Sequence, residues 1–338
     1  GDLLITNQLL YRLSHSSIIF ICAKALSIIT KNKIIASYFA RLSKICSNIF
    51  RGRQKVKFHS LAVKKGVYKR AAVCYNICME YTLITGATGV LGREFSLQCL
   101  SNGENLYLTG RSDAKLSALR RELLESHPEA EIKTFACDLA NEDSLGDLCA
   151  DAQNLTFSRL INVAGADVQK PFSRYTHKKL TMQSRVNFEA AAALCLFCLA
   201  HRAQKLCIIN ISSLAGEFVT PYFAVYASSK GALTSFSQAL AYEYRGEGVT
   251  VCAVLPGAVY TRPDVKEYIS KQGLWGRIAA KTPKYVAAKA LKAANRGKTK
   301  YVPGVANKLL YFATKLLPPR LRIAACAAVR KNMQKDAF

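Results

Sequence analysis

The glycine-rich stretch Gly86-Ala87-Thr88-Gly89-Val90-Leu91-Gly92 constrains the fold more than any other part of this sequence. It joins a short apolar run at 81–85 directly to a helical pattern at 93–102. Glycines at these spacings let a backbone turn tightly and approach a ligand, and the N-terminus of a helix attracts phosphate. The stretch therefore predicts the first strand, loop and helix of a dinucleotide-binding unit, with the loop around the pyrophosphate. A purely structural turn is the alternative.

The next predicted strand, 105–109, ends in Gly110-Arg111-Ser112. In dinucleotide sites an acidic residue at this place binds the free ribose hydroxyl of NAD, whereas an arginine accommodates the 2′-phosphate of NADP. Arg111 therefore favours NADP(H). The other interpretation of Arg111 is a solvated residue at the start of a helix.

Strand and helix patterns continue to alternate along the chain. Further strands are expected at 131–137, 159–163, 205–211, 249–255 and 299–303, and helices at 114–126, 142–153 and 284–296. The short apolar runs suit strands that are buried on both faces of a parallel sheet. We expect an α/β fold with a Rossmann-type doubly wound parallel sheet in three layers, and ligands at the carboxyl ends of the strands.

Tyr226 and Lys230 stand four residues apart in a predicted helix, so their side chains share one face. A phenol with a pKa of about 10 is a poor acid or base at neutral pH, and a nearby positive charge favours its ionised form. The pair is a candidate for proton transfer. By itself this spacing also occurs by chance on solvated helices.

The net charge of +26 is confined to the two ends of the chain. Residues 1–78 hold 14 Lys and Arg against one acidic residue, and 262–338 hold 18 against three, whereas 79–261 hold 16 against 18. The middle is therefore an ordinary, slightly acidic domain. Without a nucleic-acid-binding motif, the charge does not indicate a nucleic-acid partner.

Most of the 12 cysteines are single, and the one close pair, Cys195 and Cys198, falls in an apolar run at 190–200. No second pair or histidine accompanies it, so core packing is a better interpretation than a metal or redox site, and we expect no metal site. Cysteines used in this way suit a reducing compartment, and we expect a cytoplasmic protein.

Residues 1–78 form a basic, acid-poor leader. Its most apolar part, 13–30, contains His15 and Lys24 and is a marginal membrane span. A surface anchor or a presequence is possible. We favour a third interpretation, in which 1–78 is upstream sequence and the working protein starts at Met79, which opens the first strand.

Taken together, these motifs resemble the short-chain dehydrogenase/reductases, over residues 79 to 303, near the 3-oxoacyl reductases and 17β-hydroxysteroid dehydrogenases. The motifs that carry the resemblance, in order, are the glycine loop, Asp138, Asn162-Val163-Ala164-Gly165, Asn187, Ser213, Tyr226 with Lys230, and Pro256-Gly257-Ala258-Val259-Tyr260-Thr261. Two departures stand out. The glycines follow the spacing GxxGxxG instead of GxxxGxG, which implies an altered phosphate loop, and Val163 replaces an asparagine.

The resemblance implies a role for each catalytic residue. Tyr226 would be the general acid that protonates a carbonyl oxygen, Lys230 would favour the tyrosinate and bind the nicotinamide ribose, and Ser213 would bind the substrate oxygen. Asn187 would hold a water for proton resupply. Ser212 competes with Ser213 for the serine role, and the spacing of the family favours Ser213.

The resemblance also implies the binding site of the cofactor. Asp138 and Leu139 would meet the adenine, and Gly257 and Thr261 would flank the nicotinamide. The full cofactor-binding set is Gly86, Thr88, Gly89, Val90, Leu91, Gly92, Arg111, Ser112, Asp138, Leu139, Asn162, Ala164, Gly165, Tyr226, Lys230, Pro256, Gly257, Val259 and Thr261.

The C-terminal third is expected to choose the substrate. Residues 262–281 mix apolar and basic side chains and suit a flap over an apolar substrate. Residues 304–338 form a basic amphipathic helical tail broken by Pro318-Pro319. This tail either lies on an anionic membrane surface or packs on the domain or a second subunit.

These features lead to one main expectation and two alternatives. We expect an NADP(H)-dependent enzyme that interconverts a carbonyl and an alcohol, on an apolar or acyl-type substrate such as a 3-oxoacyl thioester or a steroid-like ketone. The resemblance also implies a homo-oligomer, either a dimer or a tetramer. The alternatives are a catalytically silent cofactor-binding scaffold, and nucleic-acid binding through the basic ends.

Overall fold

The computed structural model describes residues 79–261 and 278–330. The chain divides into two units, 1–78 and 79–338, and every described residue belongs to the second. The expectations for the leader 1–78, for most of the flap at 262–277 and for the end of the tail at 331–338 therefore concern residues outside this description.

A seven-stranded parallel sheet lies at the centre of the described residues, with the order β3-β2-β1-β4-β5-β6-β7. The strands are β1 (Glu80–Thr85), β2 (Asn105–Gly110), β3 (Ile132–Ala136), β4 (Thr156–Asn162), β5 (Arg202–Ile211), β6 (Val249–Val254) and β7 (Lys300–Tyr301). The order reverses direction between β1 and β4, which is the topological switch point of a doubly wound sheet. The predicted fold class is confirmed.

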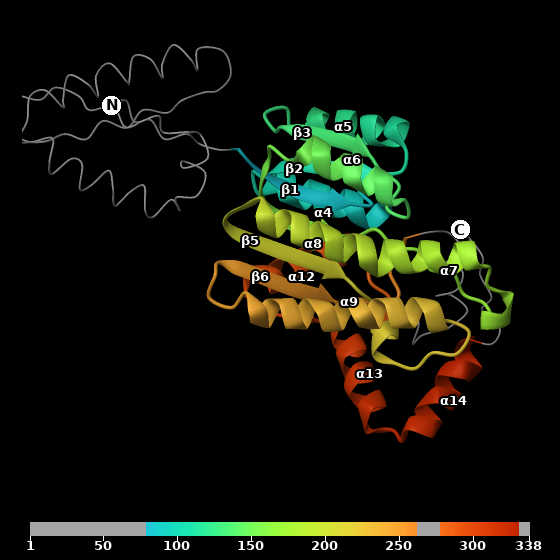
Figure 1. Cartoon of the computed structure of the whole chain (residues 1–338). Helices are drawn as coiled ribbons and strands as arrows, with labels where there is room; N and C mark the ends of the chain where they lie inside the picture. Colours follow the sequence, from blue (N-terminus) through green and yellow to red (C-terminus); the bar gives the residue numbers. More distant parts are fainter. Residues whose placement is uncertain (1–78, 262–277, 331–338) are drawn as a thin grey trace, which may run out of the picture. The chain divides into compact units, whose positions relative to one another are not determined.

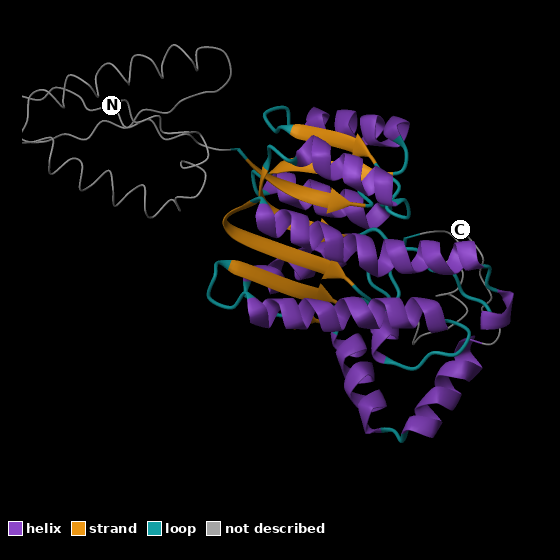
Figure 2. Cartoon of the chain, viewed as in Figure 1, coloured by secondary structure: helices purple, strands orange, loops and turns teal. Residues whose placement is uncertain are grey.

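Helices cover both faces of the sheet (Figures 1 and 2). The helices α4 (Val90–Ser101), α5 (Asp113–Ser126) and α12 (Pro283–Asn295) pack on one face. The opposite face carries α6 (Glu142–Ala152), α8 (Ala190–Ala200) and α9 (Ala224–Glu243). Between β4 and α8 lie η1 (Phe172–Arg174), α7 (His177–Ser184) and the π-helix η2 (Arg185–Glu189), and η3 (Leu214–Glu217) follows β5.

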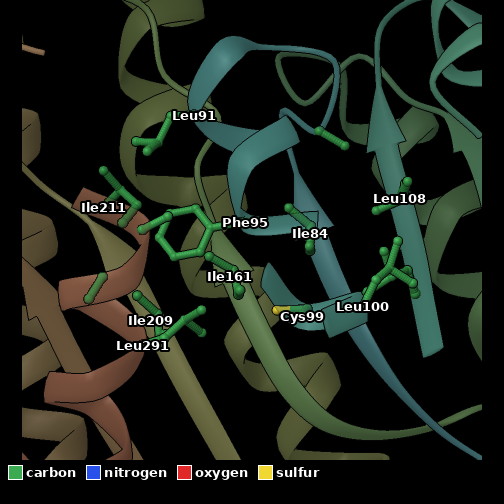
Figure 3. Close-up of a cluster of buried hydrophobic side chains, with 14 of the residues drawn as sticks. Ile84, Leu91, Phe95, Cys99, Leu100, Leu108, Ile161, Ile209, Ile211 and Leu291 are labelled. Atoms are coloured by element: carbon green, nitrogen blue, oxygen red, sulfur yellow. The ribbon is translucent and has the colours of Figure 1, made fainter. Parts of the chain in front are cut away.

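Two buried apolar clusters lie on the two faces of the sheet because successive strand residues point in opposite directions. Ile84 packs with Phe95 of α4 and Leu291 of α12 on one face (Figure 3), whereas Leu83 packs on the other. Covering both faces requires strands that are apolar throughout, which is why the predicted strands appeared as continuous apolar runs.

Cys195 and Cys198 lie in the second cluster, and both are fully buried. Their predicted role in core packing is confirmed. Burial raises the pKa of Cys195 to about 12, so this thiol stays protonated and unreactive.

Strands β4 and β5 begin earlier than the sequence patterns predicted, at Thr156 and Arg202. The additional residues of β4 include Phe157, followed by a register shift before Arg159. Arg159 remains inside the sheet because its Nε and Nη2 donate to the two oxygens of the Glu104 carboxylate, at 3.0 and 3.1 Å. The sequence could not indicate this ion pair, because the two residues lie 55 positions apart.

The last two helices of the described residues are α13 (Val305–Leu316) and α14 (Pro319–Arg330), which form a V in Figure 1. The break falls at Pro318-Pro319, as predicted, because proline fits the first turn of a helix but not its interior. Asn307 and Tyr311 of α13 are buried against the domain. Among the described helices, we find no apolar stretch long enough to cross a lipid bilayer.

Candidate active site

The predicted site residues follow the carboxyl ends of β1, β4, β5 and β6. Because all strands are parallel, these ends meet at one edge of the sheet. The glycine loop follows β1, Val163 to Gly165 follow β4, Ser212 and Ser213 follow β5, and the segment from Pro256 follows β6. The sheet therefore gathers at one edge motifs that are spread over more than 170 residues of sequence.

The glycine loop is compact despite its altered spacing. Gly86 has a φ of +62°, and a Cβ there would lie 2.9 Å from the Cα of Ala164. A Cβ on Gly92 would lie 2.3 Å from the carbonyl oxygen of Gly86, which no side chain allows. Gly89 donates its N–H to the same oxygen at 3.0 Å. The three glycines therefore fold the loop back against the start of α4.

Thr85, which the sequence analysis did not single out, fixes this loop to the neighbouring motif. Its buried hydroxyl oxygen accepts hydrogen bonds from the backbone N–H groups of Val163 and Ala164, at 3.0 and 3.2 Å. The carboxyl ends of β1 and β4 are thus joined at the switch point. The signal in the sequence is a threonine at the last position of β1, directly before the glycine loop.

The N-terminus of α4 is suited to a phosphate group. The N-cap residue is Gly89, so no side chain binds the N–H groups at the start of the helix, and the first turn contains no acidic residue. Thr88, Gly89 and Val90 are exposed, so the start of this helix is accessible to a ligand. A Cβ on Gly110 would lie 3.3 Å from the Thr88 hydroxyl oxygen, which places the end of β2 beside this loop.

Arg111 is exposed directly after β2, next to the glycine loop. Ser112 caps α5, and its hydroxyl oxygen accepts a hydrogen bond from Lys115 N–H at 3.4 Å. The Ser112 hydroxyl is thus used to cap the helix. Of this pair, Arg111 is the residue whose side chain could bind a phosphate group such as a 2′-phosphate. Asp138 is exposed after β3, and its carboxylate accepts from Ala140 N–H at 3.1 Å. Leu139 packs on the second core cluster.

Asn162 lies inside the protein and not in an open crevice. Its side-chain N–H₂ donates to Asn210 Oδ1 at 2.8 Å and to the carbonyl oxygen of Ala191 at 3.3 Å. Asn210 in turn donates to Ser237 at 2.8 Å. Asn162 therefore ties β4 to β5 and to the helices on that face, whereas Ala164 and Gly165 remain at the edge of the sheet.

Lys230 is 3% exposed, and its ammonium donates to the carbonyl oxygen of Ile211 at 2.8 Å. Burial lowers the pKa of Lys230 to about 8, and the charge of Asp167 opposes this shift. The side chain is therefore mainly cationic at neutral pH. A buried cation at the carboxyl end of β5 is a strong electrostatic feature of the site.

Asn187 lies in the π-helix η2 and is buried. Its amide nitrogen donates to Ala166 O and Ser229 Oγ, at 2.9 and 3.0 Å, and its Oδ1 accepts from Ala166 N–H at 2.8 Å. A Cβ on Gly165 would lie 3.3 Å from both Asn187 Oδ1 and Lys230 Nζ. The missing side chain at Gly165 thus leaves room beside these two polar atoms.

The two candidate serines have different surroundings. The Ser212 hydroxyl is buried and contacts Lys230 O and Thr234 Oγ1, each at 2.7 Å, so it joins β5 to α9. Ser213 is partly exposed, and its hydroxyl oxygen accepts only the backbone N–H of Ala215, at 3.2 Å, among the contacts described. Its hydroxyl hydrogen can therefore be donated to a ligand.

Tyr226 lies in the first turn of α9, one turn before Lys230, so both side chains belong to one face of this helix. Its ring stacks on the ring of Phe223, with centroids 4.2 Å apart and planes 9° apart. The stacking orients the phenol, which is partly exposed. The sequence analysis did not identify Phe223.

Two further glycines, also not identified from the sequence, bring η3 onto α9. A Cβ on Gly216 would lie 2.6 Å from Gly231 N and 2.7 Å from Lys230 C. The backbone that carries Ser213 therefore contacts the turn of α9 that carries Lys230. A glycine directly after a candidate catalytic lysine is the only local signal for this contact.

The segment after β6 is held by the C-terminal part of the domain. Pro256 is buried, and its carbonyl oxygen accepts a hydrogen bond from Leu214 N–H at 3.1 Å. A Cβ on Gly257 would lie 2.8 Å from Asn307 Oδ1 of α13. Val259 pairs with Lys281, and Thr261 N–H donates to Val259 O at 2.7 Å. The tail thus contributes Asn307 to the border of the site.

Comparison with known proteins assigns the family. The model of the short chain dehydrogenase family matches residues 80–272, which is more than half of the chain. The chain belongs to the short-chain dehydrogenases. Solved structures agree in fold: a 7beta-hydroxysteroid dehydrogenase structure superimposes with a TM-score of 0.67 at 22% identity, over 73% of this chain and 96% of that one.

Curated relatives in this family include very-long-chain 3-oxoacyl-CoA reductases. The protein from Bos taurus is 30% identical over 192 residues, covering 54% of this chain and 60% of the relative. The protein from Podospora anserina is 34% identical over 188 residues, covering 54% and 55%. The chain thus spans little more than half of the length of these relatives. The match agrees with the predicted position near the 3-oxoacyl reductases.

Proposed function

We propose that this short-chain dehydrogenase reduces a carbonyl compound, or oxidises the corresponding alcohol, with NADP(H). The proposal rests on one observation: Gly165, Asn187 and Lys230 lie close together where the carboxyl ends of the strands meet. Ser213 and Tyr226 lie on neighbouring turns, at the start of η3 and of α9. When bound, the nicotinamide would supply the hydride. The residues of the chain would bind and orient the substrate and the cofactor, and they would transfer the proton.

Tyr226 would protonate the carbonyl oxygen in reduction and take the proton back in oxidation. The Lys230 ammonium, one helical turn away and buried, would stabilise the tyrosinate that results. Ser213 would donate its hydroxyl hydrogen to the same substrate oxygen and orient it toward Tyr226. The stacking of Tyr226 on Phe223 supports this role because it limits the motion of the phenol.

Asn187 and Gly165 would support the resupply of the proton. Oδ1 of Asn187 accepts one hydrogen bond in the structure and can accept a second. A water in the space beside Gly165 would reach both Asn187 Oδ1 and Lys230 Nζ. We propose that this water links Lys230 to solvent.

The cofactor fits the residues at the edge of the sheet. The uncapped start of α4 and the close glycine loop would hold the pyrophosphate. Arg111, exposed beside that loop, would bind a 2′-phosphate and so select NADP over NAD. Asp138 and Leu139 would border the adenine, and Gly257, Val259 and Thr261 the nicotinamide.

The substrate class we propose is an apolar or acyl carbonyl compound, of which a 3-oxoacyl thioester is the leading candidate. Support comes from the names of the relatives and from the apolar composition of the flap segment. The catalytically silent scaffold remains the alternative function. The presence of all four catalytic residue types in the described site favours the enzyme.

Turnover decides between the two functions. The full chain would be tested for NADPH oxidation over a panel of 3-oxoacyl thioesters, steroid ketones and simple ketones. We expect Tyr226→Phe to lower kcat/KM by about 10²- to 10⁴-fold, the usual contribution of a general acid. Tyr242→Phe is the matched control, because Tyr242 lies on the same helix and is 77% exposed. No turnover by the wild-type chain would support the scaffold, whereas equal turnover by Tyr226→Phe would contradict the role of Tyr226 as the general acid.

We also propose that the outer face of α13 contacts an anionic membrane surface. Val305, Leu309, Phe312 and Leu316 line this face, and Leu316 is 86% exposed. Residues 304–330 contain five basic side chains and no acidic one. Two copies meeting through this face would bring like charges together, whereas anionic lipid provides the opposite charge.

Liposome flotation of the full chain tests the membrane contact. We expect binding to vesicles of phosphatidylcholine with phosphatidylserine, weaker binding to phosphatidylcholine alone, and a loss of binding in the double variant Leu309→Asp, Phe312→Asp. Flotation of the double variant at the wild-type level would refute the role of α13. The free thiols of the described cysteines fit a cytoplasmic site for this contact.

We propose a homo-oligomer, a dimer or tetramer, formed through the helices of the site. α8, which packs beside α9 on the same face of the sheet, exposes the large apolar side chain of Leu196. Sedimentation velocity would show an oligomer for the wild-type chain and a smaller species for Leu196→Asp.

A further inference from the structure

Glu217, Lys300 and Tyr311 form a closed cluster where η3, β7 and α13 meet. The Lys300 ammonium lies 2.7 Å from Glu217 Oε1. The Tyr311 hydroxyl donates to the other carboxylate oxygen, Oε2, at 3.0 Å, and it accepts a hydrogen bond from Lys300 Nζ at 3.1 Å. Both carboxylate oxygens of Glu217 are therefore bound by donors from the C-terminal part of the domain.

The cluster is largely screened from solvent. The side chains of Lys300 and Glu217 are 22% and 12% exposed, and Tyr311 packs in a small apolar cluster with Leu214 and Leu255. Burial opposes the charge on Lys300, but its hydrogen bonds to Glu217 and Tyr311 outweigh burial and raise the pKa of Lys300. Because the cluster is largely screened from solvent, these charged hydrogen bonds are stronger here than on an open surface.

The helix η3 depends on outside contacts because it is a single 3₁₀ turn of four residues. Ser213 immediately precedes it, and Ala215 N–H and Gly216 N–H donate to the Oγ and the carbonyl oxygen of Ser213, at 3.2 and 3.0 Å. On one side η3 contacts α9 through Gly216 and Gly231. Glu217 is the charged anchor on the opposite side.

We propose that Glu217, Lys300 and Tyr311 are positioning residues for Ser213. They hold η3 between α13 and α9, so that the Ser213 hydroxyl stays aligned with Tyr226 and Lys230. On this view α13 belongs to the framework of the active site. The kinetic part of this inference rests on the proposed function.

The kinetic test uses the full chain and the substrate that turns over fastest. We expect Glu217→Gln, which keeps the shape of the side chain and removes its charge, to lower kcat/KM between about tenfold and a hundredfold through a small displacement of Ser213. The dissociation constant of NADPH should change much less than kcat/KM, because none of the three side chains has a described contact with the glycine loop or with Arg111, which would hold the phosphate groups. Tyr311→Phe should show the same pattern with a smaller loss.

A double-mutant cycle separates positioning from general damage. In a Ser213→Ala background, Glu217→Gln should have little further effect on kcat/KM, because the group that it positions is absent. Equal losses in both backgrounds would contradict the proposal. Glu247→Gln is the matched control: Glu247 pairs with Arg202 at 3.5 Å at the amino-terminal edge of the sheet, away from the site.

Hydrogen exchange of the cofactor-free full chain tests the same inference without turnover. We expect Glu217→Gln and Tyr311→Phe to accelerate exchange at the Ala215 and Gly216 amides, which donate to Ser213. Faster exchange confined to α13 would overturn the proposal. If the wild-type chain reduces no carbonyl compound while these two amides respond, the proposed function fails and the positioning of Ser213 by the cluster stands.

Discussion

At the scale of single residues, Lys230 is the buried charged group of the candidate site, and its burial costs free energy of folding. Its ammonium is buried and bound to the carbonyl oxygen of Ile211 at 2.8 Å, and its pKa falls to about 8. A protein keeps such a group where its charge has a use. Here the charge lies one helical turn from Tyr226, where it would stabilise a tyrosinate.

The shifted pKa predicts how stability depends on pH. Between the folded pKa of about 8 and the unfolded pKa of about 10.4, the unfolded chain binds more protons at Lys230 than the folded chain does. As the pH rises through this window, the free energy of unfolding of the wild-type chain should therefore increase by on the order of 2 to 3 kcal/mol compared with that of Lys230→Met. Urea unfolding of both proteins from pH 7 to pH 10.5 measures the difference. Parallel profiles would contradict the burial of a charged Lys230.

At the scale of elements, the site depends on how closely η3 approaches α9. Gly216 and Gly231 allow backbone contact at the point where Ser213 and Lys230 must face each other. A π-helix, η2, places Asn187 next to the same region, and such helices are frequent at functional sites. The geometry of these short irregular elements therefore matters more to the site than the length of the regular helices.

A pair of glycine substitutions tests this close approach. Gly216→Ala should destabilise the protein by about 1 to 3 kcal/mol, because a Cβ there overlaps Gly231 and η3 must move. Gly146→Ala is the matched control: Gly146 lies inside α6 with nothing within 4 Å, so alanine should stabilise by about 0.5 to 1 kcal/mol. Chemical denaturation measures both. A neutral or stabilising Gly216→Ala would show that η3 does not contact α9 in this way.

At the scale of the whole molecule, the proposed cofactor would bridge both halves of the sheet. Groups at the ends of β1, β2, β3, β4 and β6 surround the switch-point edge, so a bound dinucleotide would contact both sides. A ligand that binds only the folded state stabilises the complete cooperative unit. Binding should therefore appear as a rise in the melting temperature of the domain.

The rise in melting temperature should be larger with NADPH than with NADH, and this difference tests which cofactor the chain prefers. At a concentration of about 100 Kd, NADPH should stabilise the chain by about 2.7 kcal/mol, and NADH at the same concentration should stabilise it less. Arg111→Ala should remove the advantage of NADPH, whereas Arg121→Ala, an exposed arginine on α5, should leave it unchanged. Thermal unfolding with each nucleotide measures these shifts. Equal shifts in the wild-type chain would contradict selection by Arg111.

The sequence alone determined the fold class and the alternation of strands and helices along the chain, because a parallel sheet covered on both faces requires apolar runs separated by amphipathic helices. Local spacing also identified the glycine loop and the pair Tyr226 and Lys230 as candidates, whereas Asn187 and Ser213 became candidates through the family resemblance. The proline break between α13 and α14 was predictable for the same local reason.

Only the tertiary structure decided which of these residues meet and what surrounds them. The inward orientation of Asn162, the role of Ser212 in joining β5 to α9, and the contact of Asn307 with Gly257 all depend on distant partners. Tyr311 and Glu217, which bind each other, lie 94 positions apart. No local pattern specifies such a partner, because the hydrogen bond forms only after the sheet has brought β7 and α13 beside η3.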